Sequence, residues 1–424
     1  MLLLFKYLLY LAGGSITATA GLASYLAFFQ PPFHFPVPTG KHAVGTVTYH
    51  WQDARNYPMA SGKELMVQFW YPTDAQKLEF PTQPYAPYFI NHIKAEYKLG
   101  WLAVLSRPMF SYAMENTMLM KDSGLLPVVI FSHGLLSTRN HNTAQCEELA
   151  SHGYVVVGIS HSFGCSVTEF PGGRLVSTDP LQERRQFLKD PLALYRQCHE
   201  EIDTWIDDVQ MVLDRLEELT SDVSSPWHDR LDVNKIGMFG HSFGGAVTTQ
   251  LCRLDARIKA GAAMDSPLFG ANATLEFAKP FMFLLADPLS EAQLVEVMHK
   301  LGLTLEQAQR FVKELHPHCI PAVEQLFRLF NQDVYKVIVQ GADHLAFCDI
   351  ALIKEACLFS GVMHNLGVGE IDGFRATEIV RAYLVAFFDK YLKGLPSELL
   401  DGNENKYQEC VSERVCLTGF EPVA

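Results

Sequence analysis

The sequence predicts an α/β protein with a mostly parallel central sheet and helices on both of its faces. Apolar runs of strand length recur along the chain from residue 127 onward, and turn residues follow them. Helical stretches fill the gaps between these runs. Strands without a polar face are typical of parallel sheets buried on both sides. Regular alternation of strands and helices is typical of a layered α/β domain.

Six apolar runs are the predicted core strands: residues 127–134, 154–160, 235–240, 260–265, 280–287 and 335–341. An earlier strand-like run covers residues 64–72. The clearest helical stripe has three-and-four spacing and consists of Ile202, Trp205, Ile206, Val209, Val212, Leu213 and Leu216. Two further helices are predicted over residues 246–254 and about 374–393.

The chain is predicted to consist of three segments. Residues 1–30 contain one charged side chain, Lys6, and are expected to be a signal peptide or an N-terminal membrane anchor, with a buried core helix as the alternative. Either of the first two puts the protein outside the cytoplasm, anchored or secreted. Residues 31–44 are a predicted linker. Residues 45–424 are the predicted catalytic domain, with a helical cap inserted at about 288–333.

Composition and short motifs argue against nucleic acid, a metal ion and a cofactor as partners. The net charge is −13 over 424 residues and no basic run is present, which argues against nucleic acid as a partner. The nine cysteines are an odd number without a CxxC pair, so internal disulfides would leave one thiol over. The sequence His316-Pro317-His318-Cys319 has unsuitable spacing for a metal site. We therefore expect neither a metal nor a cofactor.

The tetrapeptide HSFG occurs twice, and the serine of one copy fits a nucleophile turn. Gly240-His241-Ser242-Phe243-Gly244 has the spacing G-x-S-x-G between a predicted strand and a predicted helix. This spacing permits the strained turn on which enzymes of the α/β-hydrolase fold present their serine. The copy around Ser162 has Ser160 in place of the leading glycine, and a Pro-Gly-Gly run follows it. The sequence therefore predicts Ser242 as the nucleophile.

Chain order predicts the remaining catalytic groups. His344 follows the last core strand, where this fold carries its general base. Asp265 and Asp287 both end an apolar run between the serine and the histidine. The commoner arrangement of the fold favours Asp287, and the pattern alone leaves the acid open. Backbone N–H groups of Leu135 and Phe243 are the predicted oxyanion hole. Four side chains are expected near the pocket: His133, His161, Ser162 and His241.

Longer motifs resemble a single family. They are LMVQFWYPTDA (65–75), FSHGLLSTRN (131–140), LASHGYVVVGISH (149–161), GHSFGGA (240–246), AMDS (263–266) and GADH (341–344). Together they are similar to the secreted platelet-activating factor acetylhydrolases, the group VII phospholipases A2, over about residues 45–350. That family carries its acid on the strand directly after the nucleophile helix, so the resemblance implies Asp265, with Asp287 as runner-up.

The resemblance also implies an activity and partners. The expected reaction is calcium-independent hydrolysis of the sn-2 ester of phospholipids with short or oxidised acyl chains, at a membrane or lipoprotein surface. An apolar segment either enters such a surface or packs under the N-terminal region; it contains Trp101, Leu102, Val104, Leu105, Met109 and Phe110. The alternatives are a carboxylesterase acting on soluble or polymeric esters and a non-catalytic lipid-binding protein.

Overall fold

The protein is described by a computed structural model. It covers residues 32–53, 63–81, 83–85, 109–121, 123–162, 164–177, 189–269, 278–300, 302–315, 326–327, 332–356, 367–402 and 406–415. The predicted anchor or signal segment, most of the apolar segment around Trp101 and the sequence His316 to Cys319 lie outside these residues. No helix in the described ranges has the length and apolar character needed to cross a bilayer.

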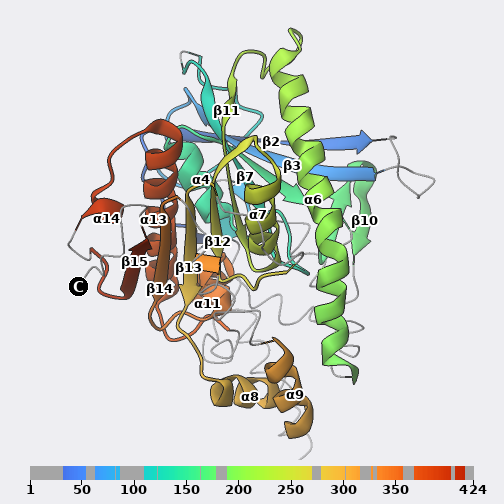
Figure 1. Cartoon of the computed structure of the whole chain (residues 1–424). Coiled ribbons are helices and arrows are strands. Elements are labelled where there is room, and N and C mark those ends of the chain that lie inside the picture. Colours follow the sequence, from blue (N-terminus) through green and yellow to red (C-terminus); the bar gives the residue numbers. More distant parts are fainter. Residues whose placement is uncertain are drawn as a thin grey trace, which may run out of the picture.

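One large sheet runs through the molecule (Figure 1). Over the described residues it has ten strands in the order β15-β14-β13-β12-β11-β7-β8-β3-β2-β6. Its parallel centre consists of β14 (Val334–Val339), β13 (Phe281–Ala286), β12 (Ile258–Met264), β11 (Leu231–His241), β7 (Leu126–Ser132) and β8 (Val155–Ser160). These strands are the six predicted apolar runs, which confirms the predicted fold class.

Antiparallel strands flank the parallel centre. On one side β15 (Cys410–Val415) pairs with β14. On the other, β3 (Lys63–Thr73) pairs with β8 and with β2 (Ala43–Asp53), and the short β6 (Met114–Glu115) follows. Residues 64–72 were predicted as a strand and lie within β3. The flanking strands widen the sheet, and β3 begins at its carboxyl edge, because Met66 pairs with Ser160 at the end of β8. The carboxyl edge is where the parallel strands of an α/β protein place a site.

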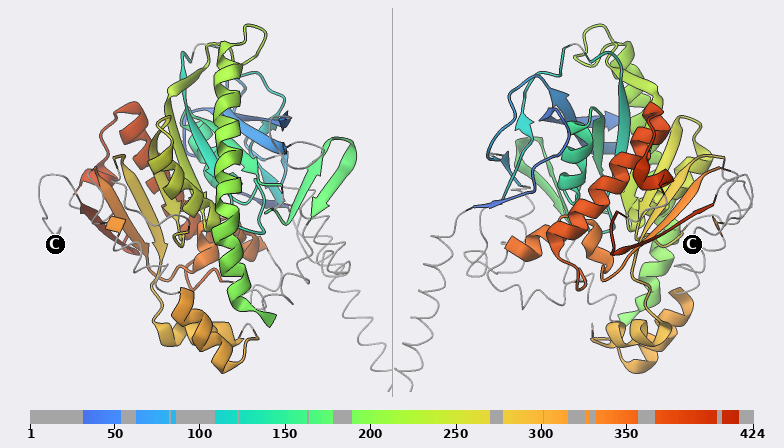
Figure 2. Two further views of the ribbon diagram at one scale, coloured as in Figure 1. Left: turned by 45° about the vertical axis from the view of Figure 1, so that its right-hand side comes forward. Right: turned by 90° about the vertical axis from the view of Figure 1, so that its left-hand side faces the viewer.

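Helices cover both faces of the sheet (Figure 2). Strand β7 shows why, because Val128 and Ile130 pack into one core and Val129 and Phe131 into the other, as expected for alternating side chains on a strand buried on both sides. The first core is covered by α6 (Pro191–Ser221) and α7 (Phe243–Leu254), and the second by α4 (Thr143–Ser151) and α13 (Gly373–Lys393).

Smaller elements complete the chain. Helices α8 (Glu291–Lys300) and α9 (Leu305–Leu315) lie between β13 and β14, within the predicted cap, and project beyond the carboxyl edge of the sheet (Figure 1). Phe311 and Leu303 of this region pack with Leu192 of α6. The other short elements are β1 (Phe33–His34), β4 (Gln83–Pro84), β5 (Met109–Ser111), β9 (Val167–Phe170), η1 (Pro171–Gly173), β10 (Arg174–Ser177), η3 (His344–Phe347), α11 (Ile350–Ala356) and α14 (Glu398–Asp401).

The segment predicted as a linker contains buried side chains. Phe33 and Phe35 pack with Tyr85 and Met109 in a small separate core. Strand β1 pairs with β5 beside it. These contacts connect the residues before β2 to the body of the domain.

Candidate active site

Three side chains form a chain of hydrogen bonds at the carboxyl edge of the sheet. The Oγ of Ser242 lies 3.0 Å from Nε2 of His344, and Nδ1 of His344 lies 2.6 Å from Oδ2 of Asp265. The carboxylate of Asp265 accepts a hydrogen bond from Nδ1 of His344, so Nδ1 carries the proton. Nε2 of the same ring is then free to accept a hydrogen bond from the Ser242 hydroxyl. The structure thus brings together the serine and histidine that chain order predicted and the acid that the family resemblance implied.

Ser242 lies on a strained turn between β11 and α7. Its φ and ψ are 53° and −122°, a backbone conformation that is unfavourable for a residue with a side chain. Neighbouring glycines allow the turn to close. A Cβ at Gly240 would lie 2.2 Å from the oxygen of Gly244, and one at Gly244 would lie 2.1 Å from the oxygen of Ser132. The strain therefore has a structural cause, which is the close approach of these backbones.

The two candidate acids differ in what they contact. Asp265 follows β12, and its Oδ1 accepts a hydrogen bond from the backbone N–H of Ala286 at 3.0 Å, which fixes the carboxylate for His344. Asp287 is exposed, and its Oδ2 accepts from Gly341 N–H at 3.2 Å. Asp287 therefore braces the turn after β14, and Asp265 is the carboxylate that meets the imidazole.

The contact with Asp265 favours the charged form of the His344 imidazole. Burial lowers the pKa of this ring, but the hydrogen bond and the negative charge of Asp265 outweigh that effect and raise it above 6.5. The same contact holds the pKa of Asp265 below its usual value, against the effect of burial. The His344 side chain is still 40% exposed, so a reactant can approach it.

The predicted oxyanion donors lie close to the serine. Phe243 begins α7, and Leu135 follows Gly134, where an added Cβ would lie 3.2 Å from Cβ of Ser242. Neither backbone N–H donates to a backbone oxygen among the described residues. Free N–H groups at a helix N-terminus attract negative charge. The arrangement can therefore accept an oxyanion beside Ser242.

A second Ser-His-Asp chain lies buried next to this region. Ser132 Oγ is 3.0 Å from Nε2 of His161, and Nδ1 of His161 is 2.8 Å from Oδ2 of Asp208. Lys63 forms an ion pair with the other oxygen of Asp208. All four side chains are buried, so no substrate reaches this serine. Because Ser132 is the last residue of β7, these hydrogen bonds fix the end of the strand that leads to Gly134 and Leu135.

Trp205 connects the buried chain to the nucleophile helix. Its ring stacks on His161 with the centroids 3.9 Å apart and meets Phe243 edge-on at 4.8 Å. The sequence analysis did not identify Asp208. Its signal was position, because it lies three residues after Trp205 and four before Val212, on the apolar stripe of α6.

The four side chains expected near the pocket are all buried. Ser162, in the first HSFG copy, donates from Oγ to the backbone oxygen of Glu64 at 2.9 Å. His133 lies against His161 and Trp205. His241 lies against His344, with ring centroids 4.7 Å apart. Together with His141 and Cys348, His241 forms the group in the described ranges with donor atoms close enough to hold a metal ion.

The fold is that of the α/β-hydrolase class, and the comparisons with known proteins identify a carboxylic ester hydrolase. The sequence profile of the family "Platelet-activating factor acetylhydrolase, isoform II" matches residues 27–219 and 220–409. The chain belongs to that family.

Individual relatives have low sequence identity to this chain, but the matches cover most of its length. A platelet-activating factor acetylhydrolase of Gallus gallus is 22% identical over 85% of this chain and 84% of its own length. A probable 1-alkyl-2-acetylglycerophosphocholine esterase of Arthroderma benhamiae is 26% identical over 68% of this chain and 67% of its own. The solved structure of a ferulic acid esterase from Streptomyces cinnamoneus superimposes with a TM-score of 0.68 at 26% identity, covering 90% of this chain and 99% of that one.

Proposed function

We propose that the protein is a serine esterase that hydrolyses the sn-2 ester of phospholipids with short or oxidised acyl chains. The observation that carries the proposal is the chain Ser242–His344–Asp265, with 3.0 and 2.6 Å between its polar atoms, at a strained turn before α7. The names of the relatives in chicken and Arthroderma benhamiae support the substrate class.

The proposed roles follow from the geometry. His344 accepts the proton of Ser242 as its Oγ attacks the ester carbonyl, and Asp265 stabilises the resulting imidazolium. The N–H groups of Leu135 and Phe243 bind the oxyanion, and each such donor contributes about 2.7–4 kcal/mol in comparable sites. The imidazolium then protonates the leaving alcohol. Water activated by the same imidazole releases the acyl group and restores Ser242.

A position outside the cytoplasm, at a membrane or lipoprotein surface, belongs to the same proposal. The support is the apolar character of residues 1–30 and of the segment around Trp101. A surface-bound substrate would then reach the serine without leaving its lipid aggregate.

The test is acetate release from a 2-acetyl phospholipid in EDTA. The wild type and Ser162→Ala should release acetate, and Ser242→Ala should not. A fluorophosphonate probe should label the wild type and fail to label Ser242→Ala. Labelling without acetate release would leave a serine hydrolase and favour the carboxylesterase alternative, which the neighbouring ferulic acid esterase structure represents. No labelling and no hydrolysis would favour the non-catalytic lipid-binding alternative.

A further inference from the structure

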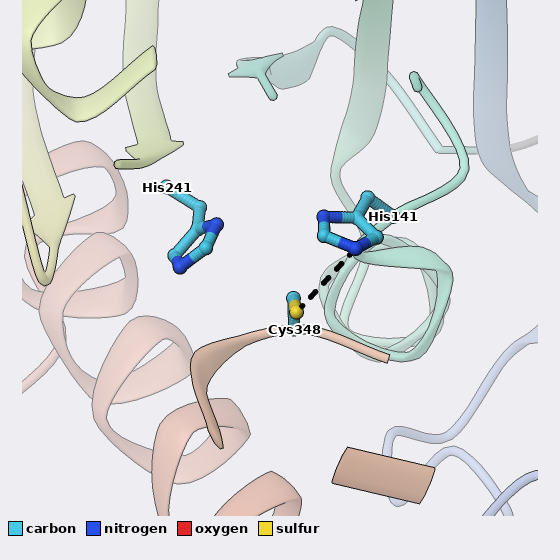
Figure 3. Close-up of side chains that lie close together, drawn as sticks. All are labelled: His141, His241 and Cys348. Atoms are coloured by element: carbon cyan, nitrogen blue, oxygen red, sulfur yellow. Dashed lines mark hydrogen bonds between the residues drawn. The ribbon is translucent and has the colours of Figure 1, made fainter. Parts of the chain in front are cut away.

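Three side chains that the proposed reaction does not use converge beside His344. His141 precedes α4, His241 ends β11, and Cys348 directly follows η3. One donor atom from each lies within 4.8 Å of those of the other two. Figure 3 shows the two imidazoles facing each other across a gap, with the sulfur below it. The exposed fractions are 9%, 1% and 0%, so protein surrounds the group.

Both imidazoles carry an unused nitrogen. Nε2 of His241 donates to the backbone oxygen of His344 at 2.9 Å, which leaves Nδ1 of the neutral ring with a free lone pair. Nδ1 of His241 and Nδ1 of His141 are buried without a hydrogen-bond partner in the described part of the chain. Leaving such an atom unsatisfied costs about 1–3 kcal/mol. A cation bound by Nδ1 of His241, Nε2 of His141 and the sulfur would remove the part of that cost that belongs to His241.

The side chains of the group are of the types that bind transition-metal ions. Two imidazoles and a thiol offer nitrogen and sulfur donors. No carboxylate is part of the group, so its donors are two nitrogens and one sulfur.

The spacing of one donor pair also suits a metal ion. Nε2 of His141 lies 3.6 Å from Sγ of Cys348. Nitrogen and sulfur atoms bound tetrahedrally to one zinc ion lie about 3.5 Å apart, given bond lengths of about 2.0 and 2.3 Å. Without an ion the thiol donates to the oxygen of Leu345 at 3.3 Å. That bond satisfies the thiol but leaves Nδ1 of His241 without a hydrogen-bond partner in the described residues.

We propose that His141, His241 and Cys348 bind one transition-metal ion of the Zn²⁺ type, with water in the fourth position, and that this ion inhibits the esterase. Two imidazoles and a thiolate are ligands that such ions prefer over Ca²⁺ or Mg²⁺. On binding, the Cys348 thiol loses its proton to solvent and the sulfur binds as thiolate. Affinity should therefore fall as the pH is lowered.

The inhibitory half rests on the proposed function, because it acts through His344. His241 is adjacent to Ser242 in the chain, its Nε2–H holds the backbone oxygen of His344, and the two rings are in contact. Cys348 lies four residues after His344. An ion that draws His241 and Cys348 together therefore shifts the serine and the base relative to each other, and displacements near 1 Å lower rates by about 10²-fold.

Metal binding is measured on the full chain after treatment with EDTA and removal of the chelate. Zn²⁺ is titrated in competition with a chromophoric chelator, and Co²⁺ binding is followed by the thiolate-to-metal absorption band. The wild type should bind one equivalent of Zn²⁺ and show the Co²⁺ band. Cys348→Ala should lose both. The matched control is Cys252→Ala, a buried cysteine in α7, which should keep both.

Inhibition is measured with a soluble p-nitrophenyl ester. Zn²⁺ should inhibit the wild type and Cys252→Ala, while Cys348→Ala should keep its metal-free activity in Zn²⁺. Absence of stoichiometric binding to the wild type, or equal binding by Cys348→Ala, overturns the site. Binding without inhibition overturns the inhibitory half. Zn²⁺ binding by a wild type that hydrolyses no ester would support the metal site and count against the proposed function alone.

Discussion

The carboxylate of Asp265 has two duties that a neutral amide can perform only in part. It fixes the His344 tautomer through Nδ1 and stabilises the imidazolium that forms when Ser242 attacks. Asp265→Asn should lower kcat by about 10⁴-fold, as loss of the equivalent acid does in other triads. Steady-state hydrolysis of a soluble ester measures this.

Asp287→Asn is the matched control for that substitution, because Asp287 is an exposed carboxylate that contacts Gly341 N–H instead of His344. It should keep near wild-type kcat. Full activity of Asp265→Asn together with an inactive Asp287→Asn would show that Asp287 is the catalytic acid.

The pH profile of the enzyme should report His344. Attack needs the neutral ring, so kcat/KM should rise with pH through an apparent pKa above 6.5, since Asp265 raises the pKa of the imidazole. In Asp265→Asn the raising charge is gone, and the rise should move to lower pH. An unshifted profile in that variant would mean that another group titrates.

At the scale of elements, α6 contributes more than apolar packing to the site. Its Asp208 carboxylate lies between Lys63 and His161, and the side chains of the Lys63–Asp208 pair are only 8% and 5% exposed. Breaking a buried ion pair by neutralising one partner costs about 3–5 kcal/mol. Asp208→Asn should lower the free energy of unfolding by that amount. Urea denaturation with a midpoint well below that of the wild type would establish it.

Asp203→Asn is the control on the same helix, since Asp203 is exposed. Its unfolding midpoint should stay at the wild-type value. If both variants unfolded at the wild-type midpoint, the buried hydrogen-bonded side chains from Ser132 to Lys63 would not contribute to the free energy of unfolding.

The central elements were predictable because each has a local signal. Strands of a sheet covered on both faces read as continuous apolar runs, and all six were identified. The boundaries were less predictable: β2 begins at Ala43, within the predicted linker. Strands near the edge of a sheet mix polar and apolar residues and resemble extended loops. Ser242 and His344 were identifiable from the turn spacing and chain order that their chemistry requires.

The two buried histidine clusters had no comparable signal. His161 and Asp208 lie on different elements, and so do His141, His241 and Cys348, which 100 or more residues separate from one another. Only the folded sheet brings them together. Asp265 needed a family resemblance, since both candidate aspartates end apolar strands and a one-dimensional pattern does not show which one faces His344.

At the scale of the whole molecule, a net charge of −13 bears on the proposed lipid substrate. Repulsion from an anionic surface lowers the rate of encounter, and salt screens it over a Debye length of about 10 Å at 0.1 M. Hydrolysis of a short-chain phospholipid should therefore be faster in zwitterionic than in anionic vesicles at low salt, and the difference should shrink as salt is added. Acetate release measures both rates.

The rate on a soluble neutral ester is the reference for that experiment, because it should change little with salt. Faster hydrolysis in anionic vesicles at low salt would point to a local positive surface that overrides the net charge.

The edge of the sheet nearest to His344 has a consequence for how the protein is made. Strand β14 leads into the His344 turn, and its outer edge is covered by β15. Among the strands that the structure describes, β15, at residues 410–415, comes last in the chain. Ribosomes synthesise chains from the N-terminus, so nascent β14 has an unpaired edge until those residues emerge. An unpaired edge is prone to pair with other chains. Export before completion of the sheet would protect the growing chain, and a chaperone that holds extended segments would have its clearest target at β14.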